Sequence, residues 1–194
     1  MGFTLCRDAT AAEWLLEQGL AWHRLAARGP AGYPGYARVR FIPDPSFSGQ
    51  QLNDVRFDQR ALSEKEQVGM ALETLARFTT TPDTCYFALW NGRSTITVDS
   101  APQLVIPHRD YWLLAGALAD YADWNSDDRE RWPFGDCPDP AFIWPADRAW
   151  CVAHDVDPHF ASIGADAEAI ALLVADRRLD AVPDDPSREP PYWY

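Results

Sequence analysis

The sequence places two carboxylates and an imidazole at alternate positions of one short segment. Asp155, Asp157 and His159 lie in the run His-Asp-Val-Asp-Pro-His at 154–159. In an extended strand such residues share a face, so they could bind a divalent ion and activate water, as in a metal-dependent hydrolase. The competing interpretation is a strand that ends in a proline turn. It is favoured because no second His/Asp cluster of matching spacing occurs.

Other catalytic patterns have less support. The sequence contains neither a Gly-x-Ser-x-Gly motif nor a glycine-rich phosphate motif, and no cofactor is expected. Cys85 and Cys151 lie within apolar runs, where a thiol behaves as a small hydrophobic group. A dyad of Cys137 with His108 stays open. The pattern as a whole favours a protein that is not an enzyme.

Tryptophan is unusually frequent, with 9 residues in 194. Trp124, Trp132 and Trp144 lie in a polar, proline-rich stretch at 120–145, where aromatic rings could line a groove or anchor a partner protein. The alternative, which we favour, is that these rings pin a long loop to the sheet. A long loop needs a small core of its own to stay ordered.

A pocket for a small ligand is a third hypothesis. Its walls would be Trp90, Trp144 and Trp150, with Arg109 or Arg148 binding an anionic group of the ligand. An apolar pocket beside one of these arginines would support the hypothesis, and a solid core would remove it.

The charge balance narrows the choice of partner. Asp and Glu number 29 against 17 Lys and Arg, which gives a net charge of −12. Such a surface repels phosphate backbones, so direct nucleic-acid binding is not expected. It suits a partner protein with a basic face, because complementary fields speed association and disfavour wrong partners.

The sequence also indicates a compartment. It contains no apolar run of about 18 residues, so no membrane span is expected. Asp8 and Glu13 come before any apolar run at the N-terminus, which argues against a secretion signal. The four cysteines have no paired spacing. We therefore expect a cytoplasmic protein.

Three helices are expected, each begun by residues that cap a helix N-terminus: Thr10 with Glu13, Ser63 with Glu66, and Asp166. Gly29-Pro30 would end the first helix. Strands are expected where apolar residues run together or alternate: 37–42, 85–90, 94–98, 104–106, 111–118 and 147–157. Asn91-Gly92 predicts a type I′ hairpin between the second and third of these strands.

Hairpins thus dominate over parallel crossovers in the expected order of elements. This predicts an α+β fold with a single, largely antiparallel sheet and about three packed helices. Residues 1–182 would form one domain. Residues 183–194, which are rich in proline and end in Tyr-Trp-Tyr, would form a non-helical aromatic tail.

Several segments resemble known families. The run Trp-Pro-Ala-Asp-Arg-Ala-Trp at 144–150 resembles a motif of a family of uncharacterised cytoplasmic proteins from high-GC bacteria. The segment 87–92 and the pattern Pro107-x-Arg109-x-Tyr111 resemble the same family, over residues 82–182 in all, and the resemblance implies no activity. The acidic, aromatic-rich composition and the Trp-Asn-Gly turn are also similar to the SUKH immunity proteins of bacterial toxin systems.

The leading hypothesis is a non-enzymatic, acidic protein-binding module with an immunity-type or adaptor role. Its binding residues would be the loop tryptophans Trp124, Trp132 and Trp144, together with Trp90, Arg109 and Arg148. The metal-dependent hydrolase and the small-ligand binder are the alternatives.

Overall fold

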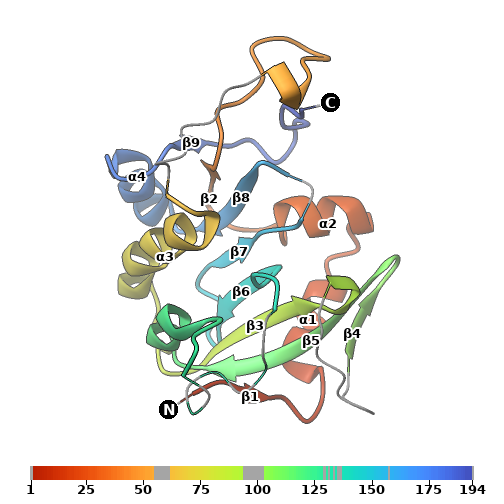
Figure 1. Cartoon of the computed structure of the whole chain (residues 1–194), viewed down its shortest axis with the longest axis vertical. Coiled ribbons are helices and arrows are strands. Elements are labelled where there is room, and N and C mark those ends of the chain that lie inside the picture. The colour runs from red at the N-terminus through yellow and green to blue at the C-terminus, as the bar shows by residue number, and fades with distance from the viewer. Residues whose placement is uncertain are drawn as a thin grey trace.

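The computed structural model describes residues 2–54, 62–93, 103–128, 130, 132, 134, 137–156 and 158–193. These residues form one nine-stranded sheet, and its strand pairs are antiparallel. Helices cover both faces of the sheet (Figure 1). The predicted α+β class with a single, largely antiparallel sheet is confirmed.

The strands, in chain order, are β1 (Thr4–Leu5), β2 (Gly35–Arg40), β3 (Cys85–Trp90), β4 (Gln103–Ile106), β5 (Arg109–Gly116), β6 (Phe142–Pro145), β7 (Cys151–Ala153), β8 (Phe160–Ala165) and β9 (Ala181–Pro183). They pair in the order β1-β5-β3-β6-β7-β8-β2-β9, and β4 also pairs with β5. The expected central strand 85–90 coincides with β3, which pairs with β5 and with β6.

The α-helices are α1 (Glu13–Leu16), α2 (Trp22–Arg28), α3 (Glu64–Leu75) and α4 (Ala167–Ala175). A 3₁₀ helix, η5 (Leu118–Asp123), follows β5. Buried side chains of α3, α4 and η5 share one core cluster with one face of the sheet, and those of α1 and α2 share a second cluster with the other face. The sheet is therefore the middle of three layers (Figure 1).

Two of the expected helix starts form as predicted. At α3 the Ser63 N–H donates to Glu66 Oε2 at 2.8 Å, and the Glu66 N–H donates to Ser63 Oγ at 3.2 Å. At α4 the Asp166 side chain accepts from the Glu168 N–H at 2.8 Å. These caps satisfy backbone donors that a helix leaves free at its N-terminus. They are local signals, which is why the sequence alone reveals them.

The expected first helix is wrong in its length. Thr10 begins a 3₁₀ turn without a side-chain cap, α1 spans only four residues, and α2 starts anew at Trp22. Gly19 lies between the two helices with a φ of 63°. Such a left-handed residue ends a helix, so it divides the apolar stripe that the sequence shows. The predicted end of the helix at Gly29 is confirmed. The Gly29 N–H donates the last hydrogen bond of α2, to the Leu25 carbonyl at 2.8 Å.

The strand expected at 147–157 is also wrong. Its first residues form a turn, in which the Arg148 N–H donates a hydrogen bond to the Pro145 carbonyl at 2.8 Å. Only Cys151–Ala153 forms a strand. The next strand, β8, was not expected at all. Its six residues are all buried, so they lack the alternation that marks a strand with one wet face.

The expected type I′ hairpin at Asn91-Gly92 is not adopted. Asn91–Arg93 forms a 3₁₀ turn, and neither Asn91 nor Gly92 has a positive φ, which that turn type requires. The return strand expected at 94–98 lies outside the described residues.

The residues after β9 lie against the domain. Guanidinium groups of α2 hold their backbone: Arg24 donates to the Pro186 carbonyl, and Arg28 Nη1 donates to the Arg188 carbonyl at 2.8 Å. The Trp193 indole N–H donates to the Pro43 carbonyl at 3.1 Å. The aromatic tail is thus a latch on its own domain. Within the described ranges, no helix is long and apolar enough to cross a membrane.

Candidate functional site

Two members of the predicted metal set, Asp155 and His159, each contact a different charged residue. Asp155 Oδ2 lies 3.4 Å from Arg109 Nη2, and His159 Nε2 lies 3.0 Å from Asp44 Oδ1. Asp157 lies outside the described residues. In the part of the chain that is described, no group of three His, Cys, Asp or Glu side chains could hold a metal ion. β7 ends at Ala153, so Asp155 and His159 do not continue the strand whose alternation would have placed them on one face.

Nucleophilic cysteine chemistry is not favoured either. Burial, followed by the charge of Asp147, raises the pKa of Cys85 to about 12, and burial alone raises the pKa of Cys151. Cys137 belongs to the core beneath α3, whereas His108 packs against Trp22 of α2 at 5.1 Å between ring centroids, on the other face of the sheet. The Cys137–His108 dyad therefore does not form.

The loop tryptophans are core residues. Trp124, Trp132 and Trp144 are each 0% exposed, so the prediction that they form a binding face is wrong. Trp124 and Trp132 pack together at 4.3 Å between centroids, and Phe3 meets both rings edge-on at 5.2 Å. The Trp124 indole N–H donates to the Pro138 carbonyl at 3.2 Å. The Trp124 and Trp132 rings thus pack in the core beneath α3, as the favoured interpretation predicts, whereas Trp144 lies in strand β6 and not in the expected loop.

The tryptophan-walled pocket is not formed as predicted. Trp150 lies in the core beneath α3 and α4, whereas Trp144 lies in the core beneath α1 and α2. The sheet separates the two rings, so they cannot wall one cavity. Arg148 stacks over Trp14 at 5.2 Å and lies beside β6 at the Cys85 end of β3. Arg109 lies at the Trp90 end of β3.

One half of that predicted pocket is brought together. The Arg109 guanidinium lies 4.5 Å from the Trp90 ring and 5.7 Å from the Trp22 ring. A surface hollow of about 600 Å³ is lined by Trp90, the β4–β5 turn and Arg109. The Tyr111 hydroxyl and Asp155 Oδ1 are buried and have no hydrogen-bond partner within the described part of the chain. The arrangement stacks a cation between aromatic rings and ties it to a buried carboxylate.

A cluster around Asp44 joins β2 to the segment before β8. Arg38 Nη1 lies 2.7 Å from Asp44 Oδ1, and Arg40 Nη1 lies 3.1 Å from Asp44 Oδ2. His159 Nε2 also contacts Asp44 Oδ1. Burial acts to raise the pKa of Asp44, but hydrogen bonds from Arg38 and His159 outweigh it and hold the pKa well below its ordinary value. Burial lowers the pKa of His159, and the bond to Asp44 offsets this only in part.

Acid is expected to destabilise the fold in two steps. Below the ordinary His pKa of about 6.5, the unfolded chain binds a proton that folded His159 does not, so the free energy of unfolding falls as pH falls. Asp44 adds a second loss of stability, because its folded pKa lies below the ordinary Asp pKa of 3.8. This loss develops as the pH falls from about 3.8 toward the lower folded pKa. Urea titrations from about pH 8 down to about pH 2 measure the first step and most of the onset of the second.

The variant His159→Gln should lose the first step and keep the second. His23→Gln, an exposed control on α2, should keep both. An unchanged first step in His159→Gln would show that another group controls the acid response.

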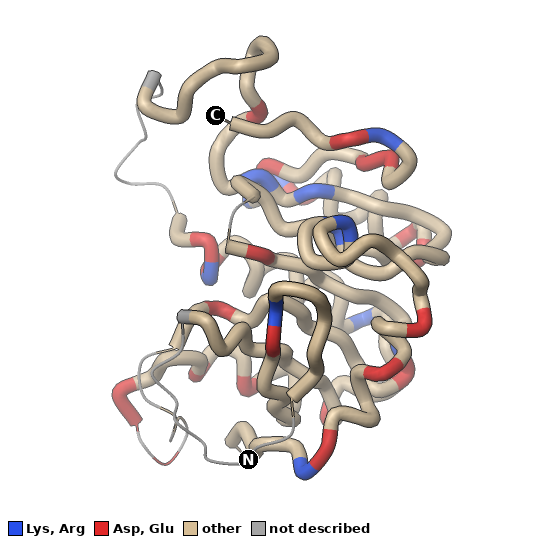
Figure 2. Tube along the Cα trace, turned by 90° about the vertical axis from the view of Figure 1, so that its right-hand side faces the viewer, with Lys and Arg blue, Asp and Glu red and all other residues tan. Residues whose placement is uncertain are grey.

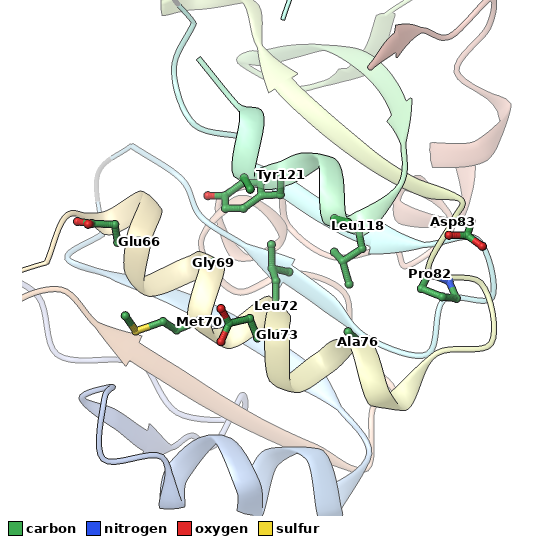
Figure 3. A pocket seen from close by; sticks show the side chains of 12 residues that line it. Glu66, Gly69, Met70, Leu72, Glu73, Ala76, Pro82, Asp83, Leu118 and Tyr121 are labelled. Atoms are coloured by element: carbon green, nitrogen blue, oxygen red, sulfur yellow. The ribbon is translucent and has the colours of Figure 1, made fainter. Parts of the chain in front are cut away.

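A groove lies between α3 and η5 (Figure 3). These two elements cover the face of the sheet opposite α1 and α2. It has a volume of about 520 Å³, and its floor and walls are mostly apolar. The side chains of Met70, Leu72, Ala76, Pro82 and Leu118 line it. Every charged residue among those that line this apolar groove is acidic.

The rim of the groove is acidic. Glu66, Glu73 and Asp83 are exposed and line it, and no Lys or Arg occurs among its described lining residues. Glu66 also accepts hydrogen bonds from Ser63, which lower the pKa of its carboxyl. Glu73 lies 2.9 Å from Arg178, an ion pair exposed to solvent. The groove therefore presents three carboxylates around apolar surface.

Elsewhere the acidic residues are spread along the whole trace, and they do not gather on one element (Figure 2). Sequence reasoning missed the groove because its two walls are far apart in the chain. One signal was available: Gly69, Leu72, Glu73 and Ala76 recur at helical spacing beside the expected buried face of the helix.

The chain matches no protein-family model, and no curated protein or solved structure is similar to it. The resemblance to the high-GC bacterial family and the likeness to SUKH immunity proteins therefore stay predictions.

Proposed function

We propose that this chain is a non-enzymatic protein-binding module that binds a basic, partly apolar segment of another protein in the α3–η5 groove. The observation that carries the proposal is the apolar groove with Glu66, Glu73 and Asp83 on its rim. Apolar burial would supply most of the binding free energy, and the carboxylates would select basic partners and speed their encounter.

The absence of a convincing catalytic set supports a binding role. In the described residues no metal cluster forms, and burial holds the pKa values of Cys85 and Cys151 far above that of a reactive thiol. The net charge of −12 attracts basic partners at long range, and the acidic rim favours the same partners at contact. An immunity-type or adaptor role, in which a basic partner is covered, is the form of this function that we favour.

Photo-cross-linking tests the proposal. Benzoylphenylalanine is placed at position 119, which is exposed and lines the groove, and the protein is irradiated in a lysate of its native host. We expect cross-linked peptides in which Lys or Arg flanks apolar residues. The triple variant Glu66→Gln, Glu73→Gln and Asp83→Asn should lower the yield about tenfold, at about 0.5 kcal/mol for each exposed charge.

The variant keeps the helix start intact, because glutamine can replace glutamate in a capping box. A matched control, Glu13→Gln with Glu17→Gln and Glu168→Gln, changes the net charge by the same amount away from the groove. Equal yields from the two triple variants would overturn the proposal. So would acidic cross-linked segments, or an equal yield from a cross-linker at position 17.

A further inference from the structure

Gly69 lies in the middle of α3 and lines the groove. A Cβ atom added there would meet Tyr121 at 3.7 Å and 3.9 Å, which is ordinary van der Waals contact. The fold therefore has room for alanine, and alanine is the better residue inside a helix. Packing of the free protein gives no reason for glycine. A reason appears when another chain passes close to the helix backbone at this point.

Tyr121 forms the wall opposite Gly69. Its side chain is 4% exposed, its ring stacks parallel to Phe87 at 6.4 Å, and its hydroxyl has no hydrogen-bond partner among the described residues. Figure 3 shows the hydroxyl directed toward the Glu66 end of the groove. A buried hydroxyl without a partner costs free energy, so a ligand that supplies the partner is favoured.

The length of the groove limits what can occupy it. From Glu66 to Ala76, α3 rises about 15 Å at about 1.5 Å per residue. An extended segment of about five residues spans the same distance. The carboxylates of Glu66 and Asp83 lie toward the two ends of the groove (Figure 3). Charge complementarity therefore places basic residues at both ends of the occupant.

We infer that the occupant is an extended segment of about five residues that is basic at both ends. Its main chain runs along the groove, passes over Gly69 and accepts a hydrogen bond from Tyr121. This inference rests on the proposed function and names the form of the partner. An extended main chain has free carbonyl groups, whereas an α-helix uses its own carbonyls internally. The Tyr121 oxygen is buried in the free protein, so the bond requires that the segment expose it on binding.

A peptide-binding experiment tests the inference. The probe is fluorescein-labelled Lys-Lys-Val-Ala-Val-Lys-Lys-amide, whose β-branched residues favour an extended chain. Fluorescence anisotropy gives Kd for the wild type, Gly69→Ala and Tyr121→Phe. Each variant should bind about three- to tenfold more weakly, the size of one lost contact or hydrogen bond. Each should also unfold at a temperature no lower than the wild type, because neither change removes a stabilising contact.

Two matched controls separate binding from stability. Tyr111→Phe removes the other buried tyrosine hydroxyl that has no partner, on the opposite face of the sheet, and Thr74→Ala raises helix propensity in α3 outside the groove. Both should bind the probe as the wild type does. If the three rim substitutions abolish binding but Gly69→Ala and Tyr121→Phe bind normally, the inference is overturned and the proposed function stands.

The remaining outcomes are also decisive. A wild-type protein that does not bind the probe overturns the proposed function together with the inference. Tighter binding of a helix-forming peptide of the same charge, built on leucine and alanine, overturns the extended form alone.

Discussion

Trp132→Ala is expected to lower the free energy of unfolding by about 3–5 kcal/mol, a large share of the stability of a domain of this size. Trp132 is 0% exposed and packs on Trp124 and Phe3. Its removal leaves a cavity beneath the loop that follows η5. Trp124 also contacts Tyr121 at 6.4 Å between centroids, so the loss reaches the wall of the groove. Urea denaturation followed by circular dichroism measures the change.

Trp90→Ala is the matched control. Trp90 is only half-buried and stacks with Arg109 at 4.5 Å, so its loss should cost about 1–2 kcal/mol. If Trp132→Ala cost no more than Trp90→Ala, the Trp132 ring would not be the core residue described above, and the interpretation as a surface anchor would return.

Asp184→Ala is expected to cost a further large amount, about 3–5 kcal/mol, because it leaves a buried cation without its counterion. Asp184 contacts Arg28, and its Oδ1 lies 3.3 Å from Arg38 Nε. The side chains of Arg28 and Asp184 are 6% and 8% exposed. Thermal and urea unfolding of the variant measure the loss.

A comparison of variants isolates the cause. The double change Arg28→Met with Asp184→Leu should cost less than Asp184→Ala alone, since it removes both charges together. Arg178→Ala breaks an exposed pair with Glu73, where Arg178 is 50% exposed, and should cost under about 1 kcal/mol. A double variant less stable than Asp184→Ala would show that the pair itself, and not the uncompensated charge, holds the tail.

The local parts of this fold could be predicted from the sequence. The caps of α3 and α4 and the end of α2 each depend on a few neighbouring residues, and all three are confirmed. The central strand β3 is apolar on both faces and stands out for that reason. The first helix was overextended because one glycine, Gly19, outweighs a continuous apolar stripe.

The turn within the Trp-Pro-Ala-Asp-Arg-Ala-Trp motif shows a second limit. Asp147 accepts hydrogen bonds from Thr79, from the Thr80 and Ala149 N–H groups and from the Thr80 hydroxyl. Burial acts to raise the pKa of its carboxyl, but these bonds outweigh that effect and lower it. The turn is thus stabilised by residues from a distant part of the chain. A local pattern that alternates cannot reveal such a partner.

The candidate site could be predicted least of all. Tryptophans such as Trp124 and Trp132 occur both in protein interfaces and in the cores of loops. Only their packing around Phe3 shows that they are core residues here. The groove depends on a missing side chain at Gly69 and on the distance between α3 and η5. Gly69 and its helical spacing are visible in the sequence, but the distance between the two helices is not. The net acidic charge follows from the composition. The position of three carboxylates on the groove rim depends on the tertiary structure.

The ends of the sheet also restrict how a partner can approach. In the described residues one edge is β9, three residues long and closed by Pro183, and the other is shared by β1, two residues long, and β4. A proline lacks the N–H that a docking strand needs, and so short an edge offers few free backbone groups. Strand addition to this sheet, whether by a partner or by a second copy in aggregation, is thereby disfavoured. For the proposed partner, the helical face is then the surface that stays available, and side chains there would determine selectivity.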